Sequence, residues 1–119
     1  MAEALVLCRN GERTRLDFSI ERARGAIGRC LGLMGRPPLK QDEGMWLAHT
    51  AAIHTFAMRG AIDVVFVAGD GRIVRAVSNV APNRLFIGAL GASSVLELAP
   101  GSIERLGLRT SDALFFETL

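Results

Sequence analysis

The chain has 119 residues, of which 50% are hydrophobic and 22% are charged, and its formal net charge at pH 7 is +2. This length allows one core that buries about 65% of the unfolded surface, so residues 1–119 are interpreted as a single domain. The composition excludes a disordered chain. The first apolar run, residues 4–8, is too short for a secretory leader, and no run approaches a membrane span, so we expect a cytoplasmic, soluble protein.

A β-hairpin is predicted at the start of the chain. Two extended runs, residues 4–8 and 13–18, flank Asn10-Gly11. This dipeptide is typical of a two-residue turn between antiparallel strands, because both of its residues adopt a positive φ readily.

One main helix is predicted at about residues 19–33. Ser19 fits the N-cap position, and Gly35 with the two prolines that follow would end the helix. Apolar residues recur at spacings of three and four, as on one face of a helix, namely Ile20, Ala23, Ile27, Leu31 and Met34.

The rest of the chain is predicted to be mostly strand, with a short helix between Ser102 and Gly107. Residues 64–67, Val-Val-Phe-Val, do not alternate with polar residues, which indicates a strand covered on both faces. The predicted strands are 44–48, 53–58, 61–68, 72–77, 94–99 and 113–117. The expected fold is therefore mostly β (α+β), a compact β-barrel or sandwich-like domain with one main helix near the N-terminus and a short one near the C-terminus.

Five segments in order resemble the bacterial and archaeal family called domain of unknown function 192. They are residues 32–39, 44–47, 54–67, 94–101 and 106–114. The resemblance implies one compact β-dominated domain, often exported or lipid-anchored in other members, and no assigned activity. This chain departs from the family pattern in two places, Ala57-Met58-Arg59 and Ser111-Asp112.

Three polar residues interrupt the apolar stretch 53–67. His54 lies on an apolar stripe, and Asp63 opens the hydrophobic strand, where a carboxylate needs partners. Arg59 and Arg36 are the candidate partners. In one interpretation Asp63 makes a structural ion pair or a bond to the backbone. In the other, His54, Arg59, Asp63 and Arg36 line a ligand-binding pocket.

No metal or cofactor is predicted. Cys8 and Cys30 stand outside any Cys-x-x-Cys pattern and are expected to be free thiols. His49 and His54 are five residues apart, which places them on opposite faces of a strand. No phosphate-binding or dinucleotide-binding fingerprint occurs.

Three functions stay open. The preferred one is a non-catalytic binding domain for a small molecule, peptide or protein, with an exposed apolar groove around Trp46 and residues 79–86. The alternative is a hydrolase-like enzyme using the His/Arg/Asp pocket, although no serine lies in a nucleophile pattern and the catalytic residues are unknown. The second alternative is nucleic-acid binding through the basic half, residues 1–40, which has Arg9, Arg13, Arg15, Arg22, Arg24 and Arg29 but only Phe18 for stacking.

Overall fold

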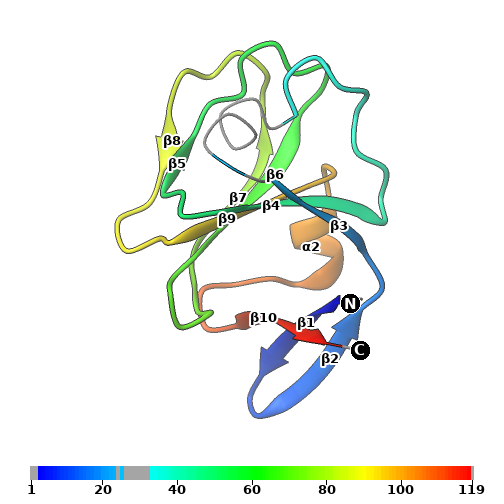
Figure 1. Cartoon of the computed structure of the whole chain (residues 1–119), viewed down its shortest axis with the longest axis vertical. Helices are drawn as coiled ribbons and strands as arrows, with labels where there is room; N and C mark the ends of the chain where they lie inside the picture. Colours follow the sequence, from blue (N-terminus) through cyan, green and yellow to red (C-terminus); the bar gives the residue numbers. More distant parts are fainter. Residues whose placement is uncertain (1–2, 24, 26–32, 119) are drawn as a thin grey trace.

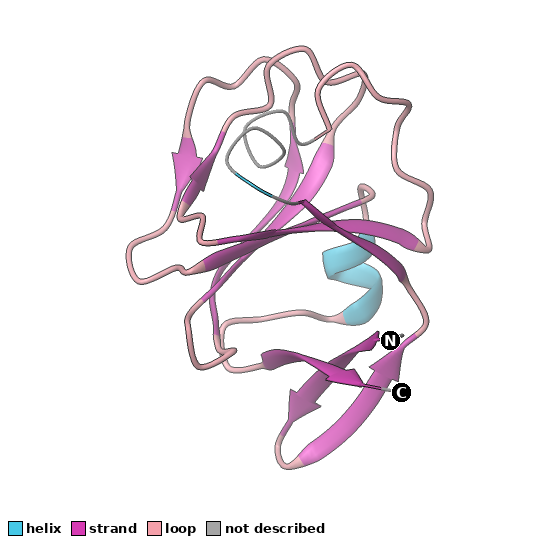
Figure 2. Ribbon diagram, in the orientation of Figure 1, coloured by secondary structure: helices cyan, strands magenta, loops and turns pink. Residues whose placement is uncertain are grey.

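The computed structural model describes residues 3–23, 25 and 33–118, which form a mostly β domain with the short helix α2, Ser102–Leu106 (Figures 1 and 2). In chain order the strands are β1 Glu3–Arg9, β2 Glu12–Leu16, β3 Ser19–Ala23, β4 Glu43–Ala48, β5 Ala52–Ile53, β6 Ile62–Val67, β7 Ile73–Val80, β8 Ile87–Gly88, β9 Ser94–Leu98 and β10 Ala113–Thr118.

A five-stranded sheet lies at the centre of the molecule. Its strand order is β3-β4-β9-β6-β7, with β3 and β4 parallel and the other neighbours antiparallel. Figure 1 shows this sheet between two layers. On one side lie α2 and the sheet β10-β1-β2, and on the other side lies the two-stranded sheet of β5 and β8, called here the β5–β8 ribbon.

Each face of the central sheet has its own apolar core, and successive residues of β6 alternate between them. The α2-side core contains Val65 and Val67, whereas the ribbon-side core contains Val64 and Phe66. Every residue of β6 is buried. The prediction that this strand is covered on both faces is therefore confirmed, and its lack of polar alternation follows from that cover.

Several predicted elements are confirmed. The turn between β1 and β2 is Asn10-Gly11, with φ of 50° and 79°, as a type I′ turn requires. The hairpin of β6 and β7, the strands β4, β9 and β10, and the short helix ending at Gly107 are also present. The predicted strand 53–58 is wrong beyond its start, because only Ala52–Ile53 pairs and Ala57 has a φ of 59°.

The predicted main helix at 19–33 is wrong at its start. Ser19–Ala23 is strand β3, paired in parallel with Glu43–Leu47. Residues 24 and 26–32 of the prediction lie outside the described residues. Glu21 and Arg22 lie opposite Met45 and Trp46 in that register. Pairing with the neighbouring strand β4 outweighed the helical spacing of the apolar residues.

A closed barrel does not form within the described residues. Each of the three sheets has two end strands in its hydrogen-bonding order, so the barrel expectation is wrong and the sheets are open. No helix in this part of the chain is long and apolar enough to cross a membrane.

Candidate functional site

Asp63, the most distinctive residue of the sequence, is fully buried and bonded to backbone. Its Oδ1 accepts a hydrogen bond from the Asn79 N–H at 2.8 Å, and its Oδ2 accepts one from the Ile103 N–H at 2.9 Å. Ile103 is in the first turn of α2, and Asn79 has a φ of 55° beside a register shift between β6 and β7. Of the two interpretations, the structure shows the bond to the backbone: Asp63 joins β6, β7 and the start of α2.

Arg36 and Arg59 line one groove, whose empty volume is about 210 Å³. Both Arg36 Nη atoms donate to the Glu21 carboxylate at 2.8 Å. This hydrogen bonding raises the pKa of Arg36 and lowers that of Glu21. Apolar and small residues make up the rest of the lining: Leu33, Pro37, Pro38, Leu39, Met58, Gly60, Ala61 and Ile62.

His54 follows β5 directly and is half-buried, and its Nδ1 accepts a hydrogen bond from the Phe56 N–H at 3.1 Å. Neither His54 nor Asp63 is among the residues that line the groove of Arg36 and Arg59. Two of the four predicted ligand-binding residues therefore share a groove. The pocket of all four stays a prediction.

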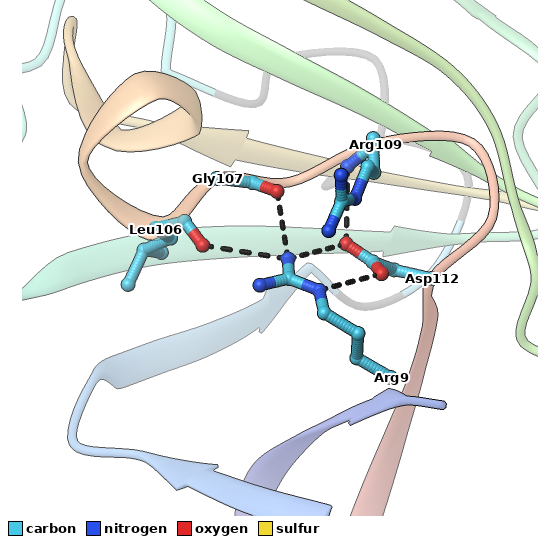
Figure 3. Close-up of polar contacts among 5 residues, drawn as sticks. All are labelled: Arg9, Leu106, Gly107, Arg109 and Asp112. Atoms are coloured by element: carbon cyan, nitrogen blue, oxygen red, sulfur yellow. Dashed lines mark hydrogen bonds and ion pairs between the residues drawn. The ribbon is translucent and has the colours of Figure 1, made fainter. Parts of the chain in front are cut away.

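A polar cluster around Asp112 fixes the end of α2 (Figure 3). Arg9 donates through Nε and Nη2 to the two oxygens of the buried Asp112 carboxylate, at 2.9 and 2.6 Å, and through Nη2 to the Gly107 carbonyl at 2.7 Å. The bond from Arg9 lowers the pKa of Asp112. The Arg109 N–H also donates to Asp112 Oδ2 at 3.1 Å. The cluster ties β1 to the segment before β10, a structural role.

Glu97 is a buried charged residue that the sequence analysis missed. It is 3% exposed in the middle of β9, and burial raises its pKa to about 7. The one sequence signal is a single acidic residue inside the apolar run Val95-Leu96-Glu97-Leu98, which alone does not distinguish a buried carboxyl from one at a solvated strand face.

Exposed apolar side chains gather on the loops that flank the ribbon. Leu90 is 101% exposed, Leu85 80%, Phe86 71% and Phe56 52%. These four residues are called the β5–β8 surface. The predicted groove was placed around Trp46 and residues 79–86. The Trp46 part of this prediction is wrong, because the Trp46 side chain is buried and its ring lies edge-on to that of Phe116, with the ring centroids 5.0 Å apart. The loop 79–86 does expose Leu85 and Phe86.

Thr55 joins two of the loops of this surface, the one after β5 and the one before β8. The Thr55 N–H donates to the Arg84 carbonyl, and the N–H of Asn83 donates to the Thr55 carbonyl, both at 2.8 Å. The Thr55 hydroxyl donates to the Ala81 carbonyl at 2.7 Å and accepts from the Arg84 N–H at 2.8 Å. The exposed apolar side chains are therefore carried on hydrogen-bonded backbone.

The charges near the β5–β8 surface are positive. Between residues 44 and 96 the only acids are Asp63, which is buried, and Asp70, which lies in the turn between β6 and β7. The same stretch has four arginines, at positions 59, 72, 75 and 84. Arg75 Nη1 donates to the Gly88 carbonyl at 2.6 Å, which places this guanidinium on β8.

The fold and these surfaces define a small β-rich domain with an apolar, basic face. The chain belongs to the family DUF192, described as an uncharacterized ACR, whose model matches residues 6–116. Among curated proteins, none matches this chain.

Two solved structures are similar over most of their length. One, from Sinorhizobium meliloti 1021 and described as a "putative transcription regulator", is 26% identical with a TM-score of 0.83, covering 97% of this chain and 94% of that chain. The other, a protein of unknown function from Novosphingobium aromaticivorans DSM 12444, is 26% identical with a TM-score of 0.82, covering 94% and 83%.

Proposed function

We propose that this chain is a non-catalytic binding domain whose β5–β8 surface docks an acidic segment of a partner protein that also carries apolar side chains. One observation carries the proposal: Phe56, Leu85 and Phe86 are exposed on the two loops that Thr55 joins, and Leu90 is exposed on the loop after β8. A surface of this kind is typical of interaction sites, because exposed aromatic and aliphatic groups gain free energy when a partner covers them.

The charge of the same face supports an acidic partner. Arg84 lies next to Leu85 in the chain, Arg59 follows Phe56 by three residues, and Arg75 is bonded to β8. Opposite charges across an interface steer association and select against basic partners. The occupant that this chemistry fits is a segment with Asp or Glu between Leu or Phe residues.

The groove of Arg36 and Arg59 supports a second candidate, binding of a small molecule. Its apolar lining and the Arg59 guanidinium suit an anion with an apolar body, while Arg36 beside them is bonded to Glu21. The groove is open to solvent, and its empty volume of about 210 Å³ includes part of that solvent, so the ligand would be small. The hydrolase-like pocket of His54, Arg59, Asp63 and Arg36 is less supported, because both oxygens of Asp63 already accept backbone hydrogen bonds.

Nucleic-acid binding is the weaker alternative, although it would fit the description of the Sinorhizobium protein. Four basic side chains of the N-terminal half already pair with acids: Arg9 with Asp112, Arg13 with Glu117, Arg22 with Glu3 and Arg36 with Glu21. Paired arginines release fewer counterions from a phosphate backbone than free ones.

The test uses fluorescence anisotropy with labelled synthetic peptides. One peptide alternates Leu or Phe with Asp or Glu, and its control has Lys in place of each acid. We expect the acidic peptide to bind the wild-type chain, and Phe86→Ser to weaken binding by about tenfold. Phe115→Ser is the matched control, since Phe115 is an exposed phenylalanine on β10, and it should leave binding unchanged.

Two results would overturn the proposal. One is equal binding of the acidic and the lysine peptide, or no binding of either. The other is tighter binding to phosphatidylserine vesicles than to the acidic peptide, which would make an anionic membrane the partner of this surface. Binding of duplex DNA that Arg84→Glu abolishes would favour the nucleic-acid alternative instead.

A further inference from the structure

Glu97 places an ionisable group inside the ribbon-side core. Along β9, Leu96 and Leu98 belong to the α2-side core and Val95 to the ribbon-side core, so Glu97 faces the ribbon side with Val95. The residues opposite it in the sheet register are Met45 on β4 and Val64 on β6, both in the ribbon-side core. A carboxylate at this position has lost most of its water and lies among apolar side chains, which disfavour its charged form.

No hydrogen bond or ion pair holds the Glu97 carboxylate within the described part of the chain. Burial is the cause that raises its pKa to about 7, and no neighbouring charge contributes. Most of the other charged groups that the structure describes on this face are engaged elsewhere, and Arg59 lines the groove beside Met58 and Ile62.

On β3, Glu21 is bonded to Arg36, and at the start of β4 Glu43 accepts from the Lys40 N–H. On β7, Arg75 is bonded to the Gly88 carbonyl. After β5, His54 accepts from the Phe56 N–H. β6 contributes only apolar side chains to this face.

Among the strands that the structure describes on this face, those of the β5–β8 ribbon have the least backbone pairing. Its two strands have two residues each, and it packs on the sheet through Ile53 and Ile87, which belong to the same core as Met45 and Val64. A charge formed beneath it can regain water if the ribbon moves away. Local opening of this kind is easiest where few backbone bonds must break.

We propose that Glu97 is a proton-operated switch for the β5–β8 surface: the protonated carboxyl keeps the ribbon packed on the sheet, and its ionisation favours opening of the ribbon and weakens partner binding. The partner-binding half of this inference rests on the proposed function, whereas the opening half does not.

The direction and size of the effect follow from proton linkage. The pKa of Glu97 in the packed state is about 7, above the ordinary 4.5. The stabilisation of the packed state is therefore complete below pH 4.5 and is lost as the pH rises through 7. If opening returns Glu97 to water, the open fraction should rise by up to about tenfold between pH 6 and pH 8.

Hydrogen exchange followed by NMR measures the opening without any partner. The reporters are the amides of Thr55 and Ala89, which donate to the carbonyls of Arg84 and Ala51. After correction for base catalysis, we expect their exchange in the wild type to be several-fold faster at pH 8 than at pH 6. The Ile73 amide, which donates to the Asp112 carbonyl on the other side of the sheet, should not change and serves as the internal control.

Glu97→Gln should abolish this pH dependence, and Glu117→Gln, at an exposed site, should keep it. A pH dependence that persists in Glu97→Gln would assign it to His49 or His54 and overturn the inference. A carbon-13 titration of the wild-type Glu97 carboxyl covers the case in which the variant does not fold, and a midpoint near 4.5 would also overturn the inference.

Peptide anisotropy at pH 6 and pH 8 then separates the two proposals. Weaker binding of the acidic peptide at pH 8 in the wild type but not in Glu97→Gln supports the switch. Exchange that depends on Glu97 without any peptide binding supports the opening and overturns the proposed function. Peptide binding with exchange that is the same at both pH values overturns the switch and leaves the proposed function standing.

Discussion

Two buried carboxylates on adjacent strands differ in their hydrogen bonding, because different backbone groups surround them. Asp63 on β6 faces the α2 side, where the N–H groups of Asn79 and Ile103 both reach it. Glu97 on β9 faces the ribbon side, where no N–H group of the described residues donates to it. A carboxylate with two backbone donors is a structural clamp. One without donors is a group whose protonation the fold itself controls.

Asp63→Asn should destabilise the fold. The asparagine side chain has one acceptor oxygen, so either the Asn79 or the Ile103 N–H loses its partner in a buried place, at a cost of about 1–3 kcal/mol. Urea unfolding followed by Trp46 fluorescence measures this change. Asp70→Asn is the matched control, because the Asp70 carboxylate accepts an exposed N–H from Arg72. Equal stability of the two variants would contradict the role assigned to Asp63.

The sequence could identify Asp63 as unusual but not what it bonds. Its partners are backbone groups 16 and 40 residues away, which carry no side-chain signal. The arginines at 36 and 59 are the partners that the sequence suggests for Asp63, and Arg36 pairs with Glu21 instead. Glu97 could not be identified at all, because its burial depends on which face of β9 is covered.

At the scale of elements, turns were predicted well and the segment 19–23 was not. Asn10-Gly11 determines its turn locally, through the positive φ of both residues. Ser19–Ala23 fits a helical period and a strand period about equally over five residues, and its pairing with Glu43–Leu47 decided between them. The cation–π contact of Arg22 with Phe116, 4.3 Å from the ring centroid, adds a long-range contact to that choice.

Gly11→Ala tests the turn. A Cβ at Gly11 would meet no atom within 4 Å, so the cost comes from the backbone alone. With a φ of 79°, an alanine should cost about 1 kcal/mol in the free energy of unfolding, measured by urea denaturation. Gly60→Ala is the control, at a glycine whose φ is not in the left-handed region. A neutral Gly11→Ala would mean that the turn rearranges.

At the scale of the whole molecule, one sheet separates two cores. This arrangement explains why half of the chain is hydrophobic although only 119 residues are present, since both faces of the central strands need apolar cover. The sequence predicted the double cover from residues 64–67, but it could not predict which layers supply it, because that depends on the order of the strands.

Val64→Ala and Val65→Ala test the two cores separately. Both side chains are fully buried, Val64 on the ribbon side and Val65 on the α2 side. Each substitution should lower the free energy of unfolding by about 2 kcal/mol, through lost burial and the cavity left behind. Chemical denaturation of the two variants side by side gives the comparison. A neutral result for either one would mean that its core is absent in solution.

The pairing of β1 with β10 has a consequence for how the chain folds. Arg9 and Asp112, which join these regions, are 103 residues apart. The hairpin of β1 and β2 can form soon after synthesis, but one edge of β1 then stays unpaired until nearly all of the domain has been made. Contacts between such distant residues slow folding, and an open strand edge invites pairing with another chain. The nascent chain is therefore most prone to aggregate in the interval before β10 closes that edge.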